Sequence, residues 1–97
     1  MTDYMPERAM ADIVLYAQRN NIKKIILFGS RARGTYTSKS DIDLAVSGGD
    51  ASAFYLDLED FAHTLLTFDV VDFDNKEISM ELKSEIEKEG IVIYEKV

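Results

Sequence analysis

The chain has 97 residues, no cysteine and a formal net charge of -7 at pH 7. This length predicts a single domain, 1–97, with a small core and no second lobe to hold a bulky acceptor. The missing cysteines exclude a disulfide framework and a thiolate metal site, and no apolar stretch approaches the roughly 18 residues that a membrane span needs.

The first predicted element is a helix from about Pro6 to Arg19. Proline suits the first turn of a helix, and the pair Asn20 and Asn21 ends the pattern. The apolar face of this helix consists of Met10, Ile13, Val14 and Ala17. Residues 1–8 lack the basic start and apolar core of a secretory signal, so we expect a cytoplasmic protein.

Two apolar runs that are typical of strands, 25–28 and 42–46, enclose a loop rich in small residues. The loop begins with Gly29 and Ser30 and ends with Ser40. Small residues leaving a strand let backbone N–H groups approach phosphate oxygens, and a serine hydroxyl adds a donor. The loop therefore predicts a binding site for a nucleoside triphosphate.

Basic residues gather around this loop. Residues 19–40 contain six Lys and Arg and no acid, whereas the remainder carries 5 basic and 18 acidic residues. Arg31, Arg33 and Lys39 are candidates for neutralising a triphosphate, the alternative being a solvated loop flank. The acidic remainder repels a long nucleic-acid strand, so no direct nucleic-acid partner is expected.

Asp41 and Asp43 stand two residues apart at the start of the second strand, so their carboxylates share one face. Mg²⁺ binds carboxylate and phosphate oxygens and keeps several waters, which makes the pair a candidate magnesium site beside a triphosphate. A third carboxylate from a neighbouring strand would complete a two-metal centre.

The pair Gly48 and Gly49 precedes a second predicted helix. Its apolar residues recur at helical spacing and are expected to pack on the sheet: Phe54, Leu58, Phe61, Ala62 and Leu65. His63 lies between these positions, where a surface role is favoured over that of a general base.

The candidates for the third carboxylate lie in the apolar run 67–73. A charged residue in the middle of a strand is costly unless something binds it, which favours Asp69. Period-two alternation places Asp69 and Asp72 on opposite faces, so only one of them faces the metals. Asp72 remains the alternative.

The last predicted elements are a helix with the apolar stripe Ile78, Leu82 and Ile86, a stop at Gly90, and a strand over 91–94. The other helix face is rich in glutamate and is interpreted as solvated, or as a docking surface for a basic partner. The predicted fold class is α/β, with a small mixed β-sheet and helices packed against it.

The chain resembles minimal nucleotidyltransferases of the superfamily that includes DNA polymerase beta and the aminoglycoside nucleotidyltransferases. The resemblance rests on Phe28-Gly29-Ser30, on Asp41-Ile42-Asp43-Leu44 and on Asp69, and it covers nearly the whole chain. It implies Mg²⁺-dependent transfer of AMP from ATP to a hydroxyl group. Asp41, Asp43 and Asp69 would be both the metal ligands and the catalytic residues.

The resemblance also implies a partner. Minimal nucleotidyltransferases are commonly paired with HEPN-domain ribonuclease toxins, and some adenylylate a tyrosine near the toxin's active site, where the added charge and bulk block RNA. The chain would then be an antitoxin in a hetero-oligomer with its toxin. The alternatives are a catalytically idle antitoxin that acts by binding alone, and a small-molecule nucleotidyltransferase with an aminoglycoside-like acceptor.

Overall fold

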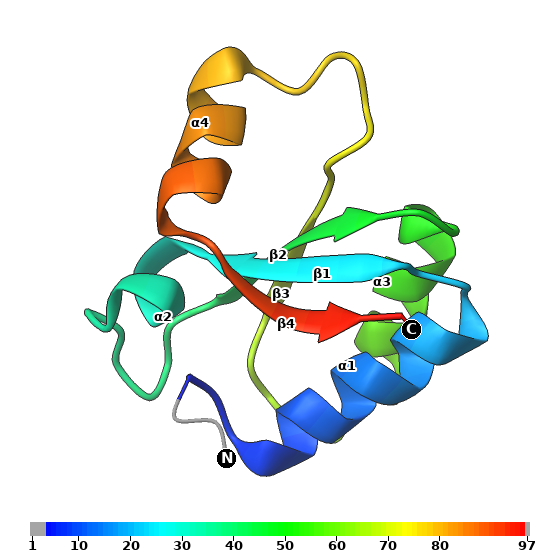
Figure 1. Ribbon diagram of the computed structural model, residues 1–97. Helices are drawn as coiled ribbons and strands as arrows, with labels where there is room; N and C mark the ends of the chain where they lie inside the picture. Colours follow the sequence, from blue (N-terminus) through cyan, green and yellow to red (C-terminus); the bar gives the residue numbers. More distant parts are fainter. Residues whose placement is uncertain (1–3, 97) are drawn as a thin grey trace.

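The computed structural model describes residues 4–96, which form a four-stranded sheet flanked by helices (Figure 1). In chain order the elements are α1 (Glu7–Arg19), β1 (Lys24–Phe28), α2 (Gly29–Arg33), β2 (Ile42–Ser47), α3 (Ala51–Phe61), β3 (Phe68–Asp72), α4 (Met80–Glu89) and β4 (Ile91–Glu95). This arrangement confirms the predicted α/β class with a small mixed sheet. No helix within residues 4–96 is long and apolar enough to cross a membrane.

The strands lie in the order β3-β2-β1-β4. β1 pairs antiparallel with both β2 and β4, whereas β2 and β3 run parallel and are joined through α3. Because β1 runs opposite to β2 and β3, the end of β1 and the starts of β2 and β3 meet at one edge of the sheet. The Gly-Ser turn and the predicted carboxylates lie at this edge.

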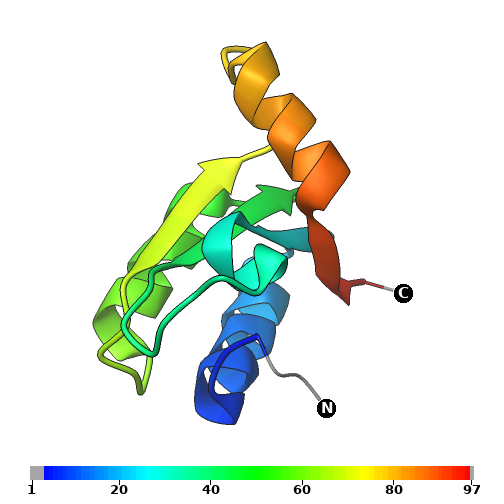
Figure 2. The same ribbon diagram turned by 90° about the vertical axis from the view of Figure 1, so that its left-hand side faces the viewer.

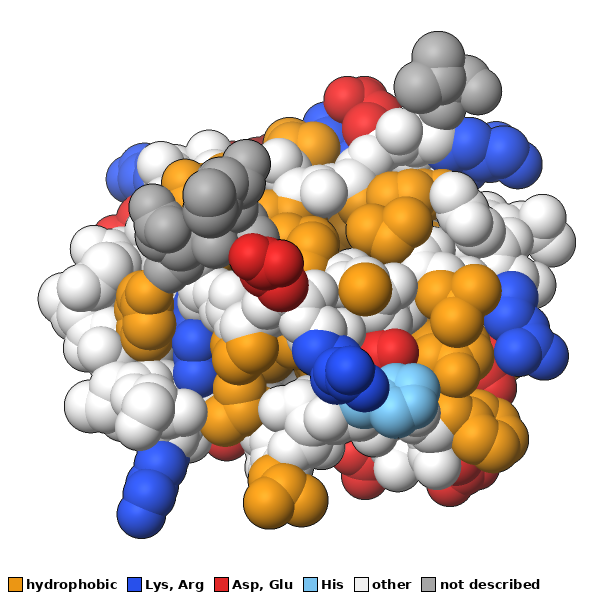
Figure 3. All heavy atoms as spheres, turned by 90° about the horizontal axis from the view of Figure 1, so that it is seen from below, with side chains coloured by type: hydrophobic (Ala, Val, Ile, Leu, Met, Phe, Trp, Pro, Cys, Tyr) orange, Lys and Arg blue, Asp and Glu red, His pale blue; other side chains and the backbone are white. Residues whose placement is uncertain are grey.

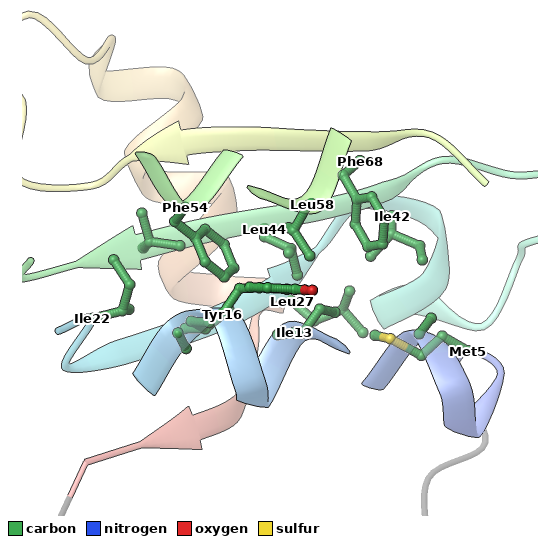
Figure 4. Packing of buried hydrophobic residues seen from close by; sticks show 14 residues of the cluster. Met5, Ile13, Tyr16, Ile22, Leu27, Ile42, Leu44, Phe54, Leu58 and Phe68 are labelled. Atoms are coloured by element: carbon green, nitrogen blue, oxygen red, sulfur yellow. The ribbon is translucent and has the colours of Figure 1, made fainter. Parts of the chain in front are cut away.

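One face of the sheet is covered by α1 and α3 and forms the main core. Figure 4 shows side chains of α1 and α3 converging on side chains of the strands. Alternate strand residues supply this face, among them Leu27, Ile42, Leu44 and Phe68, and the helices contribute Ile13, Tyr16, Phe54 and Leu58. The strands that carry the functional edge are thus fixed from this side by close apolar packing.

On the opposite face, α4 is the helix that packs against the sheet within residues 4–96, and it stands out from the sheet at one end (Figure 2). Its buried Ile86 packs with Phe28 of β1 and Ala45 of β2. This smaller cluster takes the strand residues that alternate with those of the main core. The side chains of Asp43 and Asp69 share its face by the same alternation.

Two expectations about the middle of the chain were wrong. The residues after β1 form the short helix α2 instead of an open loop, and Gly34 ends it in the left-handed conformation. α3 ends at Phe61, so Leu65 does not pack on the sheet and is fully exposed.

α3 ends early because the side chain of Asp12 binds the residue that would continue the helix. The backbone N–H of His63 donates to Asp12 Oδ2 at 2.7 Å, and His63 Nδ1 lies 3.1 Å from Asp12 Oδ1. Asp12 is buried within α1, while the imidazole is exposed as predicted and is visible on the underside of the molecule (Figure 3). This contact joins α1 to the segment that leads into β3.

Candidate active site

The turn after β1 lies directly against the carboxylate of Asp43. Phe28 at the end of β1 is paired with Asp43 in the β1–β2 ladder, which places Gly29 beside it. Gly29 has a φ of 74°, and a Cβ at this position would overlap Asp43 Oδ2. Only glycine therefore meets both the backbone conformation and the close approach.

Asp43 and Asp69 are register partners across the parallel strands β2 and β3. Both project from the face that α4 covers. Asp72 pairs with Val46 near the other end of the strands, projects from the opposite face, and accepts the backbone N–H of Asp74 at 3.0 Å. The structure thus brings Asp69, and not Asp72, to the side of Asp43.

A hollow of about 560 Å³ opens beside Asp43, and Asp69 is not among the residues that line it. It brings together most of the residues singled out in the sequence. Its lining residues are Phe28, Gly29, Ser30, Arg33, Lys39, Ser40, Asp41, Asp43 and Glu85. Asp41 immediately precedes β2 and is exposed, whereas Asp43 is partly buried.

Asp43 lies in a strongly negative environment. Burial raises its pKa to about 6, helped by the negative charges of Asp69, Asp41 and Glu85 and opposed by Arg33. Like charges this close disfavour ionisation of the group that they surround. A cation bound among them would relieve the repulsion, so the electrostatics of the site favour a positively charged ligand.

Arg31 does not line the hollow. Its buried guanidinium donates from Nε and Nη2 to the carbonyl of Ser40, at 3.1 and 3.0 Å, and from Nη1 to the carbonyl of Tyr4 at 2.9 Å. The group also lies 4.7 Å from the centre of the Tyr36 ring. Arg31 therefore fixes the backbone immediately before Asp41. Its guanidinium is occupied by these backbone carbonyls.

Glu85 of α4 was not predicted as part of the site, because the glutamates of the last helix were interpreted together as one solvated or docking face. The spacing of Glu85 from the apolar residues of the helix could have indicated its place in the site. Glu85 lies three residues after Leu82 and directly before the buried Ile86, so it borders the side of α4 that faces the sheet, whereas Ile78 precedes the helix. There it contacts Arg33, whose Nη1 lies 3.9 Å from Glu85 Oε2.

The donor set fits a hard divalent cation. In residues 4–96 no three acidic or histidine side chains converge closely enough to hold a metal ion by themselves. Mg²⁺ is usually held by one or two carboxylates, with substrate phosphates and water completing its shell. Asp41 and Asp43 beside an open hollow, with Asp69 adjacent, meet this requirement.

The glycine turn and the carboxylates of Asp41 and Asp43 thus lie around one hollow at this edge of the sheet. Residues 11–97 match the family model described as "Polymerase beta, Nucleotidyltransferase", so the chain belongs to this family. The predicted family and the predicted enzyme class, a nucleotidyltransferase, are both confirmed.

A curated relative supports this assignment. "Putative protein adenylyltransferase MJ0604" of Methanocaldococcus jannaschii is 39% identical, over 78% of this chain and 82% of that protein.

Two solved structures share the fold. One is described as the crystal structure of "the toxin-antitoxin with AMP-PNP", with a TM-score of 0.69, 24% identity, and coverage of 90% of this chain and 73% of the other. The second is a mutant of the toxin-antitoxin MntA-HpeT, with a TM-score of 0.67, 22% identity and the same coverage.

Proposed function

We propose that the chain transfers AMP from ATP, with Mg²⁺, to a hydroxyl group of a partner HEPN toxin, and that this transfer makes it the toxin's antitoxin. The observation that carries the proposal is that Asp41 and Asp43 line one hollow beside the Gly29 turn, with Asp69 as the register partner of Asp43 in the neighbouring strand. The adenylyltransferase name of the curated relative supports AMP transfer to a protein. The toxin-antitoxin neighbours support the kind of partner.

Each part of the hollow has a task in this reaction. Gly29 leaves room for the carboxylate of Asp43, while Ser30 and Ser40 offer hydroxyl groups to phosphate oxygens and Arg33 and Lys39 form the basic side of the hollow. Asp41 and Asp43 would hold Mg²⁺, which supplies charge neutralisation at the phosphates and activation of the attacking hydroxyl. Arg31 acts as a positioning residue, because it holds the carbonyl of Ser40 next to Asp41.

The reaction balances in one displacement. The acceptor oxygen, a tyrosine hydroxyl in our proposal, forms a bond to the α-phosphorus of ATP. The bond from that phosphorus to the oxygen of the pyrophosphate breaks, and pyrophosphate leaves. The hydroxyl proton passes to a base, for which Asp69 is the assigned carboxylate.

The test is to weigh intact proteins after incubating the chain with Mg²⁺, ATP and the toxin that copurifies from its own operon. We expect the toxin to gain about 329 Da, the mass of one AMP residue, or a multiple of it. Asp43→Asn and Asp69→Asn should abolish the gain. Asp72→Asn is the matched control, since it removes the same charge from the same strand on the opposite face, and it should leave the gain unchanged.

The other outcomes are equally informative. A toxin silenced in a stable complex without any gain in mass would replace transfer by neutralisation through binding alone. Loss of the gain with Asp72→Asn, but not with Asp69→Asn, would contradict the assignment of Asp69.

A further inference from the structure

Arg33 lies between the hollow and α4. It lines the hollow together with Asp41 and Asp43, yet its Nη1 is 3.3 Å from Glu89 Oε1 and 3.9 Å from Glu85 Oε2. The guanidinium is therefore paired with two carboxylates of α4. A triphosphate in the hollow would be a third and more highly charged acceptor for the same group.

The two glutamates are placed differently. Glu89 borders a neighbouring cavity and not the hollow, whereas Glu85 borders both. The carboxylate of Glu85 thus occupies the rim of the space that we assign to the triphosphate. The side chains of Arg33 and Glu85 are about two-fifths exposed, 42% and 43%, so both have room to rearrange.

We propose that Glu85 competes with the triphosphate for Arg33, so that this glutamate of α4 sets the affinity of the site for nucleotide. The inference rests on the proposed function and concerns its first step. Nucleotide binding requires Arg33 to exchange the carboxylates of α4 for phosphate oxygens. Glu85 opposes the exchange in two ways, because it holds Arg33 and because its own charge repels the incoming phosphates.

The exchange of partners concerns Arg33 and not the second basic residue of the hollow, Lys39. It lines the hollow from the loop before β2, and no ion pair with a carboxylate is found for it among residues 4–96. A first contact with the phosphates therefore needs no rearrangement at Lys39. The competition is confined to the α2–α4 side, where Arg33 and Glu85 meet.

The experiment measures the affinity of the whole chain for AMP-PNP with Mg²⁺ by isothermal titration calorimetry. Glu85→Gln should tighten binding about two- to fivefold, the upper part of the range that is typical of a partly screened charge contact. Glu87→Gln is the matched control, because Glu87 is exposed on the same helix and borders neither cavity, and it should change the affinity less than about twofold.

A double-mutant cycle identifies Arg33 as the group for which Glu85 competes. In an Arg33→Gln background, the gain from Glu85→Gln should fall to less than half of its value in the wild type. An undiminished gain there, or equal or weaker binding by Glu85→Gln alone, would overturn the competition and leave the proposed function standing. Absence of nucleotide binding by every variant and by the wild type would overturn both.

Discussion

The two faces of the sheet are built on different principles. The face under α1 and α3 is closed by large apolar side chains, with Ile13, Leu44 and Phe54 fully buried. The face under α4 has one small apolar cluster around Ile86, beside which Asp43 is surrounded by like charges. The apolar packing under α1 and α3 therefore keeps the strands rigid. This rigidity holds the mutually repelling carboxylates of the other face in place.

The largest change in the free energy of unfolding is expected from a substitution on the apolar face. Phe54→Ala removes a fully buried ring of α3 and should lower the free energy of unfolding by about 4 kcal/mol, because a cavity remains in a packed core. Urea unfolding followed by circular dichroism measures it. Leu65→Ala, at a fully exposed position, is the control and should change stability by less than about 0.5 kcal/mol.

The second effect concerns the loop that carries Asp41. Arg31→Met removes the donors that bind the carbonyls of Tyr4 and Ser40, and we expect a loss of about 3 kcal/mol in unfolding free energy. Arg33→Met replaces an exposed arginine of the same helix and should cost less than about 1 kcal/mol. Equal losses in urea unfolding for the two variants would contradict the positioning role of Arg31.

The third effect tests the contact that joins α1 to the segment before β3. Asp12→Ala leaves the backbone N–H of His63 without its acceptor and should lower the free energy of unfolding by about 2 kcal/mol. Asp12→Asn keeps an oxygen acceptor at the same position and should lose less than half as much. Amide hydrogen exchange at His63 measures the contact locally, and unchanged protection in Asp12→Ala would argue against it.

The smallest expected effect has the opposite sign and lies on the charged face. Asp43 has a folded-state pKa of about 6 against an ordinary value of 3.8, so its ionisation costs stability as the pH rises through this window. Without metal, Asp43→Asn should therefore stabilise the fold at pH 7, by about 1 kcal/mol once solvent screening of this partly exposed group is allowed for. The gain should vanish near pH 4, as urea unfolding across this range would show. A pH-independent gain would point to another cause.

Local sequence patterns were sufficient for much of this architecture. Alternation and helical spacing identified the strands around the Gly-Ser turn and the helices on either side, because these signals lie within a few residues of one another. The choice between Asp69 and Asp72 needed the register of β3 against β2, since sequence alternation separates the two faces without saying which one Asp43 shares.

Long-range contacts account for what the sequence did not reveal. Arg31 is basic and close to the turn, which favoured a phosphate ligand, but its donors bind the carbonyls of Tyr4 and Ser40, which only the fold brings near. The end of α3 at Phe61 depends on Asp12, far away in α1, and no residue beside Phe61 signals it. Glu85 had a local signal in its helical spacing, although its contact with Arg33 also required the fold.

The place of β4 in the sheet has a consequence for how the chain folds. β4 pairs with β1, so residues 91–95 complete a ladder whose other strand is residues 24–28. Closing so long an intervening segment is entropically costly, and contacts of this kind slow folding. During synthesis, one edge of β1 stays unpaired until β4 has left the ribosome, although β2 and β3, which pair Asp43 with Asp69, have already emerged. The edge that carries the proposed site can therefore assemble before the sheet is complete.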